Sequence, residues 1–129
     1  MNKQQTLISD LATDGLKRTI YVFVRTDLSL EQQIVQAAHA AVEASRRFYA
    51  PEHGVASLIV LAVSNLAALY KARNRLEDLE LEHTVFFEPD WEMGHSALAT
   101  RPVLDVERKI FKGWQLWKMV AALNEGALA

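Results

Sequence analysis

The sequence predicts a single α/β domain, a three-layer α/β/α sandwich around a mixed, mainly parallel sheet of four strands. Strand-like and helix-like segments alternate along the chain in the order β-α-β-α-β-β-α. The helical connections are long enough for right-handed crossovers between parallel strands. The chain has 129 residues, 50% of them hydrophobic, which suits one domain with a packed core.

The first strand is predicted over Thr19–Arg25, because this run is rich in β-branched and aromatic residues and lacks strict alternation. Asp27 and Ser29, which follow it, are typical of turns and helix caps. A long helix is then expected over Leu30–Tyr49, and its small alanines would let it lie close to a sheet. At 100° per residue its apolar arc contains Leu30, Ile34, Ala37, Ala38, Ala41, Ala44 and Phe48. The opposite, polar arc contains Gln32, Gln36, His39, Glu43 and Arg46.

The middle of the chain repeats the pattern. Ala56–Val63 is the second buried strand, and Ser64 and Asn65 can cap a helix that runs from Leu66 to about Glu80. A third strand is expected over Glu82–Glu88.

After the loop Pro89–Gly94, the segment His95–Thr100 is predicted to be a fourth strand that pairs antiparallel with the third. Pro102–Phe111 is predicted to be a helix, and Gln115–Trp117 a short strand or extended segment. We expect residues 1–16 to form an arm or short helix, residues 17–118 the domain, and residues 119–129 a helical tail.

The composition limits the classes of function. Fourteen Lys and Arg stand against sixteen Asp and Glu, a net charge of −2, which argues against nucleic-acid binding through bulk positive charge. The chain has no cysteine, hence no disulfide and no thiol nucleophile. The longest apolar run, Leu58–Val63, is far shorter than the ~20 residues that span a membrane. With no signal-peptide pattern at the N-terminus, we expect a cytoplasmic protein without a membrane segment.

One motif is more specific. Arg25-Thr26-Asp27-Leu28 ends the first strand, and Gln36-Ala37-Ala38-His39-Ala40 follows on the helix. Together they resemble the type II peptidyl-tRNA hydrolase family, whose signature is an Arg-x-Asp-Leu turn and a helix that carries Gln-x-x-His-Ala. The resemblance covers roughly residues 19–118 and includes the stretch Ala97–Pro102. The Arg-Pro after the strand and the ending Leu116-Trp117-Lys118 are closer to the divergent peptidyl-tRNA hydrolase domain-containing subgroup.

The resemblance implies a dimeric three-layer protein of translation that hydrolyses the ester between a peptide and the 3′ ribose of tRNA. The sequence also departs from the family. Gln32 stands where typical members have a lysine, and the loop before the last strand lacks most of the family's pattern. In that loop Asp90 is the candidate for the family's acid, and Ser96 takes the place of a threonine.

The candidate catalytic residues are therefore Asp27, Gln32, Gln36, His39, Asp90 and Ser96. Proton handling would fall to Asp90 or His39, with Ser96 orienting water or the ester. Each also has a structural explanation: a helix cap for Asp27, a solvated helix face for His39, a surface loop for Asp90. An acid next to His95 in the same loop, Asp90 or Glu92, could orient that ring as a general base.

Further candidates concern partners. Arg46, Arg101 and Arg108 form an RNA phosphate patch if the fold brings them together. The four histidines show no metal-ligand spacing, so neither a metal nor another cofactor is expected. A candidate homodimer surface is the helix-like stripe of Trp114, Trp117, Val120 and Leu123.

Two alternatives to the peptidyl-tRNA hydrolase stay open. The first is a catalytically weak or inactive member that acts as an RNA- or protein-binding module, motivated by Gln32 and the shortened loop. The second is a hydrolase for another small ester or amide in the same cleft.

Overall fold

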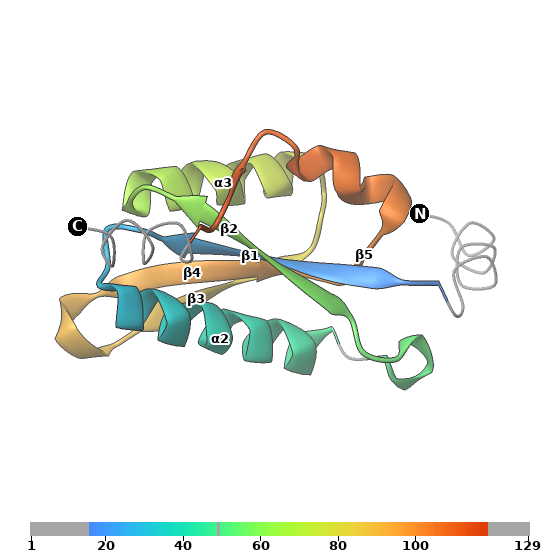
Figure 1. Cartoon of the computed structure of the whole chain (residues 1–129), viewed down its shortest axis with the longest axis horizontal. Helices are drawn as coiled ribbons and strands as arrows, with labels where there is room; N and C mark the ends of the chain where they lie inside the picture. Colours follow the sequence, from blue (N-terminus) through green and yellow to red (C-terminus); the bar gives the residue numbers. More distant parts are fainter. Residues whose placement is uncertain (1–15, 49, 119–129) are drawn as a thin grey trace, which may run out of the picture.

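The computed structural model describes residues 16–48 and 50–118, so the predictions for residues 1–15 and 119–129 lie outside it. Its centre is one mixed sheet with the strand order β3-β4-β1-β2-β6, and β5 pairs with the end of β1 (Figure 1). The strands are β1 (Arg18–Arg25), β2 (Ser57–Val63), β3 (His83–Glu88), β4 (Gly94–Thr100), β5 (Val103–Leu104) and β6 (Gln115–Leu116).

The expected mainly parallel sheet of four strands is wrong. Within the described residues six strands form the sheet, and only β1 and β2 pair in parallel. The β1–β4, β3–β4, β1–β5 and β2–β6 pairs are antiparallel. The helical crossover before β3 does bring that strand back in the direction of β1. However, a short hairpin turn returns the chain antiparallel beside β3, and the resulting strand β4 lies between β3 and β1. The strands β3 and β1 run in the same direction but are therefore not neighbours.

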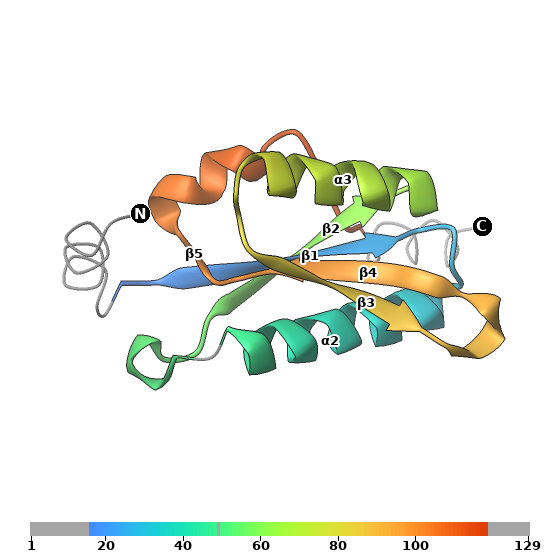
Figure 2. The same ribbon diagram turned by 180° about the vertical axis from the view of Figure 1, so that it is seen from behind.

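Helices cover both faces of the sheet, as expected for three layers (Figures 1 and 2). The helix α2 (Leu30–Arg47) lies on one face, and α3 (Leu66–Asp78) lies on the other with the 3₁₀ helix η3 (Asp105–Phe111). Side chains cap both α-helices: the Ser29 Oγ accepts from the backbone N–H of Gln32 at 3.2 Å, and the Asn65 Oδ1 accepts from that of Ala68 at 2.9 Å.

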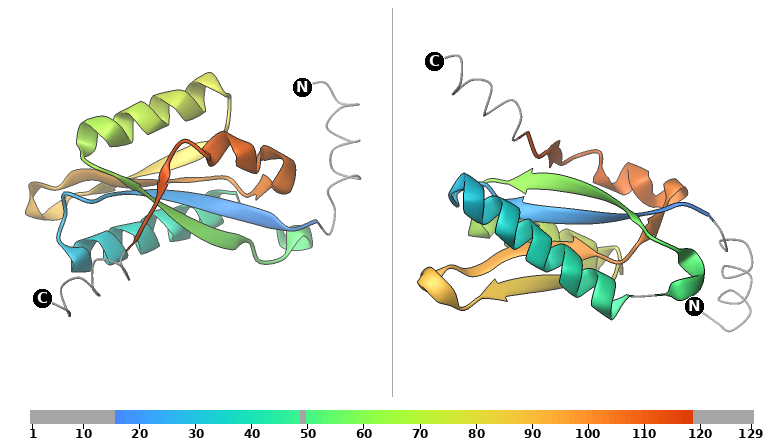
Figure 3. Two further views of the ribbon diagram at one scale, coloured as in Figure 1. Left: turned by 45° about the horizontal axis from the view of Figure 1, so that its top comes forward. Right: turned by 60° about the horizontal axis from the view of Figure 1, so that its bottom comes forward.

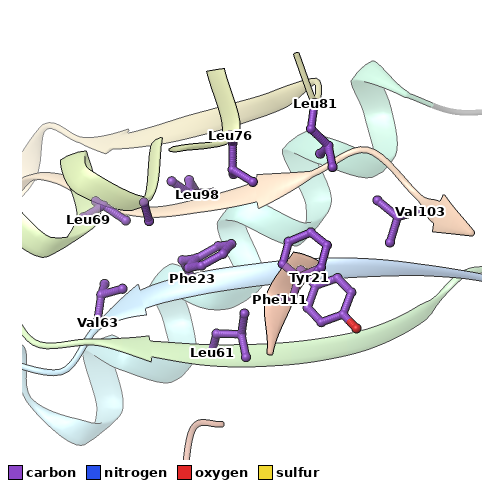
Figure 4. Packing of buried hydrophobic residues seen from close by; sticks show 11 residues of the cluster. Tyr21, Phe23, Leu61, Val63, Leu69, Leu76, Leu81, Leu98, Val103 and Phe111 are labelled. Atoms are coloured by element: carbon purple, nitrogen blue, oxygen red, sulfur yellow. The ribbon is translucent and has the colours of Figure 1, made fainter. Parts of the chain in front are cut away.

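The strand β1 supplies both halves of the core. Tyr21 and Phe23 point to α3 and η3, where Phe111 stacks on Tyr21 at 3.8 Å between ring centroids (Figure 4). Val22 and Val24 point the other way, to the alanines of α2. Burial on both faces explains why this strand shows no hydrophobic alternation, as the sequence indicated.

The hairpin of β3 and β4 contains a β-bulge. Phe86 pairs with Ala97 and Phe87 pairs with His95, so Ser96 is the extra residue on β4. The bulge lets Ser96 face α2, while His95 faces α3. The turn between the strands includes the 3₁₀ helix η2 (Asp90–Glu92).

Two local predictions need correction. Pro102–Phe111 is not one helix: Val103 and Leu104 pair with the start of β1, and the 3₁₀ helix η3 begins only at Asp105. The two tryptophans of the supposed C-terminal stripe also separate, since Trp114 packs on the α3 side of the sheet and Trp117 on the α2 side. Around β6 the chain is extended, and extended backbone sends neighbouring residues to alternate faces.

Candidate functional site

The motif residues meet at the end of the sheet where β1 finishes, α2 begins and the β3–β4 turn closes. Arg25, the last residue of β1, ties these parts together. Its guanidinium donates to both Asp27 carboxylate oxygens at 2.9 and 3.0 Å, and to the carbonyl oxygens of Met93 and His95 at 3.1 and 3.0 Å. The hydrogen bonds from Arg25 hold the pKa of Asp27 below its usual value. Asp27 is thereby an anchored anion at the surface.

A hydrogen-bonded network lies beneath this turn. The Gln36 Nε2 donates to the Glu88 Oε1 at 2.9 Å and to the Gln32 Oε1 at 3.2 Å, and the Ser96 hydroxyl donates to the Gln36 Oε1 at 2.5 Å. The side-chain amide of Gln36 therefore makes a hydrogen bond at both its oxygen and its nitrogen. We call Gln32, Gln36, Glu88 and Ser96 the amide network. It joins α2 to the ends of β3 and β4.

Burial divides the amide network into an inner and an outer part. Gln36 and Ser96 are 0% exposed, whereas Glu88 keeps 7% of its surface exposed and Gln32 is half-buried. The inner pair can hold other groups in place but cannot touch a substrate. Gln32 is the member most open to solvent, and Glu88, although buried, keeps a small exposed part.

Glu88 is a candidate residue that the sequence reasoning missed. It was counted as the last residue of a strand, and its contact with Gln36 spans 52 residues of sequence. A signal was present: Glu88 follows the apolar run Val85–Phe87 directly before the loop in which an acid was expected.

Asp90 lies apart from the amide network. It is exposed on η2, and its backbone carbonyl accepts from the N–H of Met93 at 3.1 Å. Within residues 16–48 and 50–118, no hydrogen bond or ion pair joins the Asp90 carboxylate to the network. Trp91 and Glu92 follow with φ angles of 57° and 53°, in the left-handed region, so the turn projects this stretch into solvent.

His39 lies one helical turn beyond Gln36 on α2. Its exposed ring stacks on Phe86 of β3, 4.6 Å between centroids and 3° from parallel. It therefore sits beside the amide network, along the β3 side of α2.

His95 belongs to the other face of the sheet. Its Nδ1 and the Tyr70 hydroxyl are 2.6 Å apart, and the Phe87 ring contacts it edge-on at 5.2 Å. The partner of His95 is thus a tyrosine of α3, whereas the sequence had suggested a neighbouring acid of its own loop, Asp90 or Glu92.

The three candidate RNA-binding arginines do not form one patch. Arg46 lies on α2 and Arg108 on η3, on opposite faces of the sheet. Each of the three has local partners: Arg46 bonds Glu43 at 2.8 Å, Arg101 bonds Glu107 at 2.7 Å, and Arg108 donates to the Tyr21 hydroxyl at 3.0 Å.

Arg108 instead lines a groove along η3. The groove has a volume of about 680 Å³, and Lys109 and Lys112 add two more cations to it. Its lining also includes the buried Phe111, the half-buried Trp114 and the acidic Asp105. The three cations can contact the phosphates of a nucleic-acid strand.

No cluster of three or more metal-ligating side chains occurs in the part of the chain that the structure describes. In the same residues, no helix has the length and apolar character that a membrane span needs.

Comparison with known proteins shows the fold alone. No model of a known family matches the chain, and no curated protein matches it. Among solved structures, the chain is similar to a protein of unknown function from Agrobacterium tumefaciens strain C58, with a TM-score of 0.55 and 18% identity over 79% of this chain and 98% of that chain. The likeness agrees with the mixed α/β architecture.

Proposed function

We propose that the chain is a divergent type II peptidyl-tRNA hydrolase that cleaves the ester between a peptide and tRNA. One observation supports this most strongly. Gln36 and Ser96, two residues singled out by the resemblance, are 60 positions apart in sequence and share a hydrogen bond next to a carboxylate. A carboxylate held in a fixed orientation can serve as the general base that ester hydrolysis uses.

The chemistry assigns different roles to the outer and inner members. Glu88 takes a proton from a water molecule, and the water oxygen attacks the ester carbonyl carbon. The bond between that carbon and the 3′ oxygen of the ribose then breaks, and the leaving oxygen takes up the proton from Glu88, which restores the carboxylate. Gln36 and Ser96 are positioning residues, because they touch the carboxylate system and not the substrate.

We assign to Gln32 the role of donating an amide hydrogen to the ester carbonyl, at the position where typical family members carry a lysine. A neutral amide stabilises developing negative charge less than an ammonium group does. We therefore expect a slower enzyme than a typical member, by about tenfold for each 1.4 kcal/mol lost in the transition state.

The groove along η3 is the candidate RNA contact. Arg108, Lys109 and Lys112 concentrate positive charge on a chain whose net charge is −2. Binding through these cations would weaken as salt increases.

A binding module without hydrolysis is the second candidate. It is favoured by the complete burial of Gln36 and Ser96, because a buried polar pair with its hydrogen bonds satisfied can have a purely structural role. In this case the η3 groove would hold RNA, and the amide network would have no chemical role.

The test is hydrolysis of an N-acetyl-aminoacyl-tRNA by the purified protein, with a typical family member assayed in parallel at the same salt. We expect the N-acetyl-amino acid to be released with multiple turnovers when the enzyme concentration is far below that of the substrate. If the folded protein shows no turnover at high enzyme concentration, the hydrolase proposal is rejected. Binding of tRNA in the same samples would then favour the binding module.

A further inference from the structure

The strand β3 is the outermost strand on one side of the sheet. Its inner side pairs with β4, and within residues 16–48 and 50–118 no other strand pairs with its outer side. Figure 3 (right) shows β3 at the lower edge of the sheet, beyond β4, with α2 crossing in front. Glu88, the proposed base, is the last residue of this strand. The edge therefore leads directly to the amide network.

The β3 edge lacks the features that commonly block an exposed strand. Natural edge strands are often very short, or they carry lysine, proline or a bulge. The opposite edge of the described sheet agrees with this rule, because β6 has only two residues. The strand β3 has six residues, none of them lysine or proline, and the bulge of the hairpin lies on β4. A second backbone can therefore pair with β3.

The register of the hairpin shows which main-chain groups of β3 point outward. The carbonyl of Glu82, directly before β3, accepts from the N–H of Arg101 at 2.9 Å, so Glu82 bonds inward. Successive residues of a strand direct their N–H and C=O groups to opposite sides, so Thr84 and Phe86 also bond inward, toward β4. The outward N–H and C=O groups belong to His83, Val85 and Phe87.

We propose that the peptide part of the substrate adds to this edge as an extended strand parallel to β3. The inference rests on the proposed function, because the substrate supplies the peptide. The peptide ends at the ester, and the ester must lie at Glu88. Parallel pairing is the arrangement that places this end at Glu88 and the rest of the peptide along β3. Pro89 has no N–H, so the pairing stops there and leaves the ester carbonyl without a main-chain donor.

Main-chain pairing suits a substrate whose peptide sequence varies. It uses N–H and C=O groups that every peptide has, and it therefore does not depend on particular side chains. In parallel pairing, alternate residues of the peptide bond to the edge. The first and third residues before the ester would donate to the carbonyls of Phe87 and Val85. The Phe87 ring, 56% exposed, borders the edge and offers an apolar contact to the peptide's side chains.

The first test is calorimetric binding of probes that cannot be hydrolysed to the full chain. The probes are N-acetylated peptides of one or four alanines, each joined by an amide to 3′-amino-3′-deoxyadenosine. We expect the longer peptide to bind at least about tenfold more tightly, because it adds main-chain hydrogen bonds. N-methylation of the third alanine before the linkage should remove this gain. N-methylation of the second alanine is the matched control and should preserve the gain, because its N–H points away from β3.

A variant of the protein tests the same edge. Val85→Pro removes an outward N–H and keeps the pairing of β3 with β4, because proline is tolerated where the N–H faces away from the sheet. It should reduce the gain from the longer peptide to less than about threefold. Val85→Ala shortens the same side chain but keeps the N–H, and the gain should persist. Circular dichroism checks that both variants fold, and the N-methylated probes decide the question if Val85→Pro does not.

The possible outcomes separate this proposal from the proposed hydrolysis. Equal affinity for the two peptide lengths, or equal effects of N-methylation at the second and third alanines, overturns the pairing even if the chain hydrolyses peptidyl-tRNA. Length-dependent binding without hydrolysis would support the pairing and reject only the hydrolase. If the chain instead self-associates in sedimentation equilibrium and Val85→Pro dissociates it, the edge pairs with a second copy, and the proposal is overturned.

Discussion

Gln36 holds the amide network together with both ends of its side-chain amide. Its oxygen accepts from Ser96, and its nitrogen donates to Glu88 and Gln32. A buried amide that is satisfied in this way contributes a modest net stabilisation, but its loss leaves a buried hydroxyl and a carboxylate without partners.

We expect Gln36→Leu to lower the free energy of unfolding by about 2 kcal/mol, because a side chain of similar size restores none of these hydrogen bonds. Gln32, the half-buried outer member of the network, is the comparison, and Gln32→Leu should cost less than about 1 kcal/mol. Urea denaturation measures both losses. Equal losses would contradict the larger contribution given to the buried amide of Gln36.

The ion pair between Arg101 and Glu107 leads to a prediction about the pH dependence of stability. Burial raises the pKa of Glu107, but the hydrogen bonds from Arg101 and from the N–H of Leu104 outweigh it and leave the pKa below the ordinary 4.5. The lowered pKa stabilises the fold above pH 4.5, and this stabilisation is lost as the pH falls through the folded-state value.

Glu107→Gln should therefore be less stable than wild type by about 1 kcal/mol at pH 7. The difference should shrink as the pH falls below 4.5. Thermal unfolding of both proteins across pH 3–7 measures it. A difference that stays constant over this range would contradict the role given to the ionised carboxylate.

Sequence reasoning singled out Gln36 from a motif and Ser96 from its strand position, and the structure joins the two by a hydrogen bond. It could not identify Glu88 as their partner. That contact depends on which strands are neighbours and on their register, and neither is encoded in local periodicity.

At the scale of elements, the β3–β4 hairpin does most to form the site. The β-bulge at Ser96 turns this side chain toward α2, and the tight turn brings Glu88 level with it. Both strands were predicted from their composition. The bulge was not predicted, because one extra residue in a buried strand of mostly small residues does not change the hydrophobic pattern visibly.

The turn should be sensitive at Gly94, whose φ is 70°. An added Cβ would meet the Phe87 Cε2 at 3.8 Å, an ordinary contact, so the cost of Gly94→Ala comes from the backbone and should be about 1 kcal/mol. Gly113→Ala is the control: an added Cβ there meets nothing within 4 Å, and the change should stay within about 0.5 kcal/mol. Chemical denaturation compares them, and equal costs would show that the left-handed turn is not limiting.

Strand direction was the largest error of the sequence-based prediction. Alternating strands and helices favoured a mainly parallel sheet, and the α2 crossover does join the parallel pair β1 and β2. The position of β4 between β1 and β3 follows from long-range pairing, here between Phe23 and Leu98, which local patterns do not report.

For the whole molecule, α2 separates two surfaces. Its β3 side carries the amide network and His39. Its β2 side is lined by aliphatic residues, among them Ile34 of α2 and Val60 of β2.

The central claim is that Glu88 is the base of an ester hydrolase. The most direct measurement compares kcat for N-acetyl-aminoacyl-tRNA hydrolysis by wild type, Glu88→Gln and Asp90→Asn, each shown to be folded. Removing a general base costs about 10²- to 10⁴-fold. We predict a loss of at least about 100-fold for Glu88→Gln and less than about threefold for Asp90→Asn, which lies outside the network. Turnover that survives Glu88→Gln, or falls only with Asp90→Asn, would contradict the account.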